Sequence, residues 1–108
     1  MSSSYKKYSM DGDLLEVSKV AKIIGSKWTI LILNSLLNGT KRFGELERSV
    51  GDINPKTLSK RLRDLEKEGY INKKIYAQVP PKVEYSLTPK GHVFKQVIQS
   101  VRTCGEKI

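Results

Sequence analysis

The order of hydrophobic periodicities predicts a single, mainly helical domain with one small β-hairpin. Apolar residues recur at helical spacing in five segments, and between residues 70 and 87 they alternate at a period of two. A chain of 108 residues has room for one domain of this kind and none for a second. No segment approaches the run of about 18 apolar residues that a membrane helix needs, and the first residues lack the apolar stretch of a secretory signal.

The first two helices are predicted from apolar stripes and a cap. Residues 1–13 show no period, so we expect a flexible arm there, followed by the folded domain over 14–108. Apolar residues then recur through 14–24 up to a glycine. Ser26 can cap a second helix over 26–37, whose apolar density is typical of the buried central helix of a small domain.

Two further helices follow, each with its own start and stop signals. A polar link at 40–42 leads to a short helix at 43–50, which a glycine ends. Asn54 and Pro55 form the next start signal, because an asparagine side chain caps a helix and proline suits its first position. The helix that they begin, over 54–68, repeats leucine at helical spacing and ends at a glycine suited to a left-handed terminus.

The period of two near residue 70 predicts a β-hairpin and then a last helix. Apolar residues mark one extended segment at 70–76 and alternate strictly in a second at 83–87. The paired prolines in the AQVPPK segment between them rule out a helix and favour a stiff extended loop. Thr88-Pro89 repeats the cap-plus-proline signal, and the last helix is expected to run to Cys104, just before a glycine.

This order of elements is that of a winged helix-turn-helix: a three-helix core, a hairpin as the wing, and terminal helices available for dimerisation. The helix at 54–68 occupies the recognition position. The chain carries a formal net charge of +9, and residues 54–108 hold most of the excess cations. This imbalance suggests a polyanionic partner, either nucleic acid or an acidic membrane surface. A generally basic soluble protein is the alternative.

The predicted recognition helix has a leucine face and an opposite basic face. On a helical wheel its cations lie roughly 140–200° from Leu58; they are Lys56, Lys60, Arg63 and Lys67. The acids fall in the last turn and a half, so the first half is purely basic. That half is the part which a helix-turn-helix inserts into the major groove. A solvated lysine face is the competing interpretation, since most charge runs are no more than that.

The residues predicted to contact DNA come from this helix and from the wing. Outward side chains of the helix are expected to face base edges and nearby phosphates, and Arg61, beside the core, to reach a backbone phosphate. The lysines of the hairpin are expected to hold an adjacent phosphate or the minor groove. The predicted DNA-binding residues are Lys56, Thr57, Ser59, Lys60, Arg61, Arg63, Lys73, Lys74 and Lys82.

Four segments of the chain resemble one known family. IIGSKWTILIL, FGELER, LSKRLRDLEKEGYI and VPPKVEYSLTPKG, in that order, are similar to the HxlR-type winged helix-turn-helix transcriptional regulators, relatives of the MarR class. The match extends from about Leu14 to Cys104, and its strength lies in the combination of motifs. The resemblance implies a dimeric bacterial or archaeal DNA-binding repressor or activator, with dimer contacts from the first and last helices.

The apolar stripes of the first and last helices lead to the same expectation. Together they carry more apolar surface than a small three-helix core can bury, and exposed patches of that kind usually mark an interface. We therefore predict a homodimer. The predicted interface residues are Leu14, Val17, Val93, Val97 and Val101.

One cysteine and one histidine leave little room for other chemistry. Cys104 and His92 cannot supply the three or four ligands of a metal site within one subunit, and His92 has no acidic partner nearby for catalysis. We expect no enzyme activity, no metal and no cofactor. Redox-sensing members of the resembling family carry a cysteine where this chain has Leu15. Cys104 lies on an apolar stripe and is expected to be a packed small hydrophobe, so thiol sensing is not expected.

These observations predict a cytoplasmic, sequence-specific transcriptional regulator that binds a palindromic operator in double-stranded DNA as a homodimer. The alternative is a winged-helix protein-interaction module whose basic face docks an acidic protein partner. DNA binding predicts an affinity that falls steeply with salt and a preference for one site over random duplex. A protein-docking module has no such sequence preference.

Overall fold

The computed structural model describes the backbone of residues 12–108 and the side chains from Leu14 onward. The arm predicted over residues 1–13 lies mostly outside this range, and its last two residues, Gly12 and Asp13, already belong to the first helix. The elements in chain order are α2 (Gly12–Ile24), α3 (Lys27–Leu37), β1 (Lys41–Arg42), α4 (Phe43–Val50), α5 (Pro55–Lys67), β2 (Ile71–Tyr76), β3 (Lys82–Leu87), a 3-10 turn (Gly91–Phe94) and α6 (Lys95–Glu106). The predicted fold, mainly helical with a small β-hairpin, is confirmed.

The hairpin is part of a three-stranded antiparallel sheet in the order β1-β3-β2. Lys41 pairs with Tyr85, and Arg42 pairs with Glu84. The prediction of a plain polar link at 40–42 was therefore wrong. A strand of two residues is too short to display an alternation of apolar and polar residues, so only its pairing with β3 reveals it.

The core lies where α3, α4 and α5 pack against one another, against the base of the sheet and against the start of α6. The leucines predicted as the inner face of the recognition helix, Leu58, Leu62 and Leu65, are all buried. The fully buried large side chains that surround them are Ile32, Leu33, Leu46 and Ile71. Because α5 is held along its whole leucine face, its opposite face has a fixed direction relative to the hairpin.

The predicted helix signals hold at most positions. The Ser26 hydroxyl accepts a hydrogen bond from the Trp28 amide (3.2 Å), and the Asn54 side chain accepts one from the Lys56 amide (2.8 Å). The Thr88 hydroxyl likewise accepts from the Gly91 amide (2.9 Å), but a 3-10 turn precedes α6, so the regular helix begins later than predicted. It also continues past the predicted stop before residue 105.

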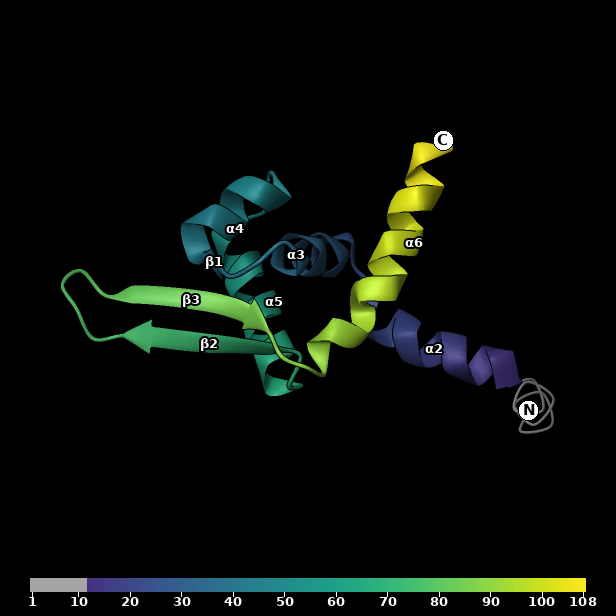
Figure 1. Cartoon of the computed structure of the whole chain (residues 1–108), viewed down its shortest axis with the longest axis horizontal. Coiled ribbons are helices and arrows are strands. Elements are labelled where there is room, and N and C mark those ends of the chain that lie inside the picture. The colour runs from purple at the N-terminus through teal and green to yellow at the C-terminus, as the bar shows by residue number, and fades with distance from the viewer. Residues whose placement is uncertain (1–11) are drawn as a thin grey trace.

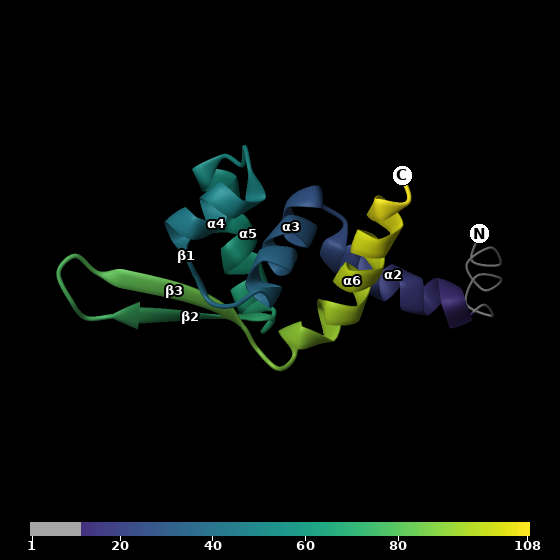
Figure 2. The ribbon, with the colours of Figure 1, turned by 45° about the horizontal axis from the view of Figure 1, so that its top comes forward.

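The terminal helices project from the core at the end opposite the hairpin (Figures 1 and 2). The radius of gyration is 16.5 Å, whereas a compact chain of this length is expected to have about 13 Å. This extended shape leaves much of the surface of α2 and α6 without contact to the core.

Candidate nucleic-acid interface

The outward face of α5 is basic and open. Lys56, Lys60 and Arg63 are all exposed, and Ser59 and Thr57 are half-buried beside them. The burial of the leucine face aims these side chains away from the core. The first half of α5 thus presents Lys56 and Lys60 to solvent and contains no acidic residue, as the sequence predicted, although Asp64 of the second half reaches back to Lys60.

The base of the hairpin meets this face of α5. A shallow cavity of about 130 Å³ lies between them, and its lining includes Ser59 and Arg63 from the helix, Lys73 from β2 and Tyr85 from β3. Burial raises the pKa of the Tyr85 hydroxyl, and the carboxylate of Glu66 raises it further, so the ring stays neutral at physiological pH. The structure therefore brings three of the predicted DNA-binding residues, one of them from the wing, to one place.

Two of the cations on the α5 face, Lys60 and Arg63, differ in their surroundings. Lys60 Nζ lies 2.9 Å from Asp64 Oδ2, and this hydrogen bond lowers the pKa of Asp64 from its ordinary value of 3.8. Among the residues that the structure describes, no carboxylate lies within 4 Å of the Arg63 guanidinium. Arg63 therefore makes no ion pair within the described chain, whereas Lys60 makes one with Asp64.

The wing lysines lie on two different faces of the hairpin. Lys73 pairs with Tyr85 and shares its face, which continues into the core. Lys74 pairs with Glu84, and Lys82 pairs with Tyr76, so these four side chains share the opposite face. Only Lys73 is directed toward the α5 side of the hairpin.

The second face of the wing is an ordered charge cluster. The Tyr76 hydroxyl donates to Glu84 Oε1 (2.9 Å), and Lys82 Nζ lies 3.3 Å from Glu84 Oε2. Both Lys74 and Lys82 place their ammonium groups over the Tyr76 ring, at 4.9 and 4.6 Å from its centre. Both hydrogen bonds lower the pKa of Glu84, and the one from Tyr76 has a larger effect than the one from Lys82. Glu84 therefore stays ionised and holds Lys82 in place.

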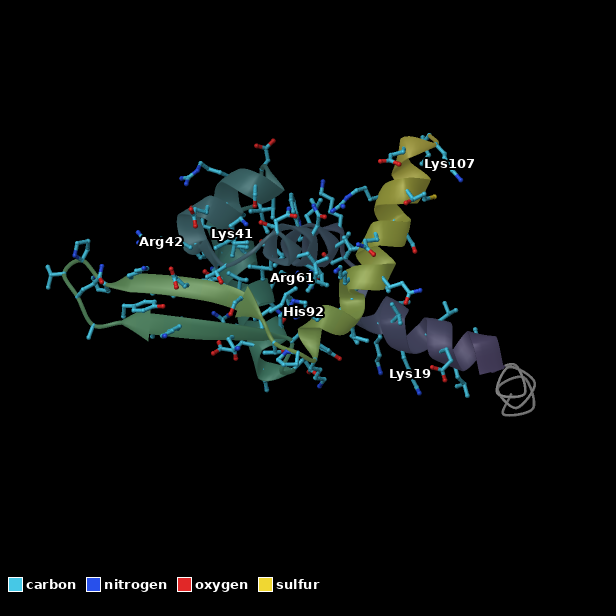
Figure 3. All side chains as sticks on the ribbon, viewed as in Figure 1. Lys19, Lys41, Arg42, Arg61, His92 and Lys107 are labelled. Carbon is cyan, nitrogen blue, oxygen red and sulfur yellow. The ribbon has the colours of Figure 1, made fainter. Side chains whose placement is uncertain are left out.

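Sequence reasoning missed the contribution of β1 to this cluster. Arg42 stands opposite Glu84 in the sheet and adds a third cation near it. Figure 3 shows Lys41 and Arg42 beside β1. The adjacent Lys-Arg pair in the sequence was the only signal, and nothing in it indicates pairing with a strand some forty residues away.

Arg61 does not join the other predicted DNA-binding residues. It lines a cavity of about 450 Å³ together with Lys22 and Ile23 of α2 and Thr29 of α3. Figure 3 shows it within the helical part of the molecule. Its Nε is buried and has no hydrogen-bond partner among the described residues. Its predicted phosphate contact remains untested.

The predicted dimer residues are largely accessible. The exposed fractions are 63% for Val17, 67% for Val93 and 44% for Val101. Leu14 is 38% exposed, and Val97 is half-buried. Cys104, on the last turns of α6, is exposed. The expectation that it is packed was wrong, because α6 extends beyond the core and its end has nothing to pack against within the protomer.

Within residues 12–108 no group of three His, Cys, Asp or Glu residues is arranged to hold a metal ion. His92 is exposed, with Nδ1 3.0 Å from the Thr88 carbonyl oxygen. No single helix in this part of the chain is long and apolar enough to span a membrane. Only α2 and α3 taken together reach the necessary length, and the chain bends by 83° between them.

The three-helix core, the added strand β1 and the wing define a winged helix-turn-helix protein. The model of the HxlR-like helix-turn-helix family matches residues 23–108, and the chain belongs to that family. Its relatives are transcriptional regulators rather than enzymes.

Similar proteins support this assignment over most of the chain. YdeP of Bacillus subtilis, named as an HTH-type transcriptional regulator, is 43% identical over 84% of this chain and 71% of its own length. The solved structure of a protein described as a MarR-family transcriptional regulator, from Porphyromonas gingivalis, is 40% identical with a TM-score of 0.80, over 83% of this chain and 88% of that one. The redox regulator HypR in its oxidised form is 35% identical with a TM-score of 0.81, over 86% and 96% of the two chains.

Proposed function

We propose that this protein is a sequence-specific transcriptional regulator that binds a palindromic operator in double-stranded DNA as a homodimer. The observation that carries the proposal is the meeting of the basic face of α5 with strand β2 at Ser59, Arg63 and Lys73. A protein that acts on bacterial or archaeal DNA works in the cytoplasm, and the relatives come from such organisms.

In this proposal α5 enters the major groove with its outward face, from Lys56 to Arg63. Arg63 is the residue best suited to read a base, because its guanidinium can donate two hydrogen bonds to guanine and has no ion-pair partner within the described chain. Lys56, Ser59 and Lys60 contact base edges or phosphates around it. The wing lysines, Lys73, Lys74 and Lys82, contact phosphates. The contacts of Thr57 and Arg61 with the backbone remain predictions.

The homodimer is supported by the apolar surface of the terminal helices. Along α2, Val17, Val20, Ala21 and Ile24 line an open apolar groove of about 420 Å³. On α6 the side chains of Val93 and Val101 are exposed. Both helices project at the end of the molecule opposite the wing (Figure 1). A second copy of the chain that covers these faces leaves both recognition helices free, as two operator half-sites require.

Sedimentation equilibrium tests the dimer with a matched pair of substitutions. Val101→Asp places a charge in the proposed interface and is expected to give monomers, while Val79→Asp makes the same change at a fully exposed wing position and is expected to leave the dimer intact. Because both valines are exposed in the protomer, neither change should prevent folding. A Val101→Asp protein that remains dimeric contradicts the proposed interface.

Selection of bound sequences from random duplex DNA at near-physiological salt tests DNA reading. The expected result is one enriched palindrome whose half-sites are spaced by about one helical turn. Affinity for that palindrome should exceed affinity for scrambled duplex by about 10³-fold or more. A module that docks an acidic protein would bind all duplexes weakly and equally, and that outcome would reject the proposal.

A further inference from the structure

The end of the recognition helix α5 is tied directly to the segment that leads into α6, although the whole wing separates the two in the sequence. The turn that ends α5 contains Gly69 at a left-handed φ of 86°, and the Tyr70 amide returns to the Leu65 carbonyl oxygen at 2.9 Å. Such a turn ends a helix and leaves the carbonyl oxygens that follow without a partner in it. Residues 88–90 supply their partners.

Thr88 binds two of these carbonyl oxygens. Its hydroxyl donates to the Gly69 oxygen at 2.7 Å, and its amide donates to the Tyr70 oxygen at 3.1 Å. The same hydroxyl accepts a hydrogen bond from the Gly91 amide at 2.9 Å. A Cβ on Gly91 would overlap the Tyr70 carbonyl oxygen, so the two backbones are in close contact here. One side chain therefore connects the end of α5 to the turn that begins α6.

Lys90 makes a second connection at the same place. Its Nζ donates to the Glu68 carbonyl oxygen at 2.8 Å and lies 4.6 Å from the centre of the Tyr70 ring. A cation at the carboxyl end of a helix also interacts favourably with the helix dipole. We call residues 68–70 together with residues 88–91 the joint. Its hydrogen bonds fix the direction in which the chain leaves α5 for α6.

The remaining contacts of α6 hold it on the core rather than on the recognition helix. Phe94 and Ile98 are buried in the core, and Arg102 donates a hydrogen bond to the Asn34 side chain of α3 at 2.7 Å. The joint adds the connection between the start of α6 and the end of α5 itself.

The direction of α6 matters because its exposed valines belong to the surface that the proposed dimer covers. The helix has 12 residues, which at 1.5 Å per residue is a length of about 18 Å. A rotation of about 10° at the joint would displace the far end of α6 by about 3 Å. The rise of one base pair in DNA is about 3.4 Å. A small change at the joint is thus comparable with a shift of one base pair in the operator.

We propose that Thr88 and Lys90 are positioning residues that set the spacing of the operator half-sites which the dimer accepts. This inference rests on the proposed homodimer on a palindrome. Both half-sites are occupied together only if the two recognition helices are about 34–36 Å apart, one turn of DNA. The joint of each protomer fixes the angle between α5 and the helix that contacts the partner. A loosened joint therefore leaves the reading of one half-site intact and weakens the simultaneous reading of two.

Four variants of the full chain form two matched pairs. Thr88→Val removes the hydroxyl and keeps the shape of the side chain, while Thr88→Ser keeps the hydroxyl. Lys90→Met removes the donor to Glu68 and keeps an unbranched side chain over the Tyr70 ring. Lys95→Met makes the same change of charge at an exposed position of α6 outside the joint.

Fluorescence anisotropy measures the Kd of each variant for the selected palindrome, for the same palindrome with one base pair inserted between its half-sites, and for a single half-site. Thr88→Val and Lys90→Met should bind the palindrome at least about fivefold more weakly than their controls, because binding must then order a loosened joint. For the single half-site they should remain within about twofold of those controls. Their preference for the original spacing over the altered one should fall, while Thr88→Ser and Lys95→Met keep the preference of the wild type.

Urea unfolding establishes that each variant is folded under the conditions of the titration, and Lys90→Met decides alone if Thr88→Val is not folded. A purely structural role of the joint lowers stability and leaves the spacing preference unchanged. An unchanged preference in the folded variants, or an equal loss on all three duplexes, overturns this inference and leaves the proposed function intact. A wild-type protein that selects no palindrome rejects both.

Discussion

Replacing Arg63 by alanine should reduce both affinity for the preferred operator and preference at one base pair. Arg63 is exposed on the outward face of α5, beside Ser59 and Lys73, and no carboxylate of the described chain lies within 4 Å of it. Its truncation therefore removes a DNA contact without releasing an acidic partner. The expected loss is roughly 1–3 kcal/mol, which is about a 5- to 150-fold increase in Kd.

Two further alanine variants calibrate this measurement. Lys60→Ala should cost less than Arg63→Ala, because Lys60 shares its charge with Asp64 at 2.9 Å and the variant also leaves that carboxylate near the DNA. Lys82→Ala, on the outer face of the wing, should weaken all sequences alike and reduce the salt slope by about one unit.

Fluorescence anisotropy titrations provide the assay, with the selected duplex and a scrambled duplex at several salt concentrations. Arg63→Ala should lose affinity mainly for the selected duplex. If Arg63→Ala weakens binding to both duplexes by the same factor, this face of α5 only contacts phosphates. Base reading by Arg63 is then refuted.

Three other predictions concern charge, redox state and stability. An NMR titration should find the pKa of Asp64 below 3.8, and in Lys60→Ala this pKa should return toward 3.8. Because the pKa is lowered, the ion pair between Lys60 and Asp64 is fully formed at neutral pH. It is lost only as the pH falls through the lowered pKa. Cys104 is exposed in the protomer but lies on the stripe of α6 that the proposed dimer covers, so it should react with iodoacetamide faster in Val101→Asp than in wild type, and diamide should change DNA affinity in neither wild type nor Cys104→Ser. Gly91→Ala should destabilise the fold by about 2–4 kcal/mol in urea unfolding, because its Cβ would overlap the backbone oxygen of the residue before β2. Gly105→Ala has open space around it and should be neutral or stabilising; equal losses for both glycines would contradict the steric argument.

The helices and the hairpin could be predicted because their signals are local. Asn54 caps α5 through its own side chain, and the leucine repeat that follows it defines which face is buried. Both features depend on residues within two turns of each other. The direction of Arg63, and hence the core of the candidate site, follows from the same helical period.

What the sequence did not reveal depends on contacts between distant segments. The strand β1 exists only because Lys41 pairs with Tyr85. The exposure of Cys104 follows from the extension of α6 past the core, which a periodic stripe does not encode. The Arg61 cavity needs the end of α2, at Lys22 and Ile23, to come near the second half of α5. In each case the deciding neighbour is tens of residues away.

The recognition helix illustrates how neighbouring cations acquire different roles from one geometric constraint. Once the leucines fix one side of α5 in the core, a step of two residues rotates a side chain by about 200°. Arg63 therefore faces the wing base and open solvent, while Arg61 is turned into the cavity beside α2. Both residues carry the same charge, but Arg63 is exposed on the outward face of α5, whereas Arg61 lines a cavity between helices. A basic helix thus indicates DNA binding through the face on which its cations lie, and the total charge does not distinguish these two surroundings.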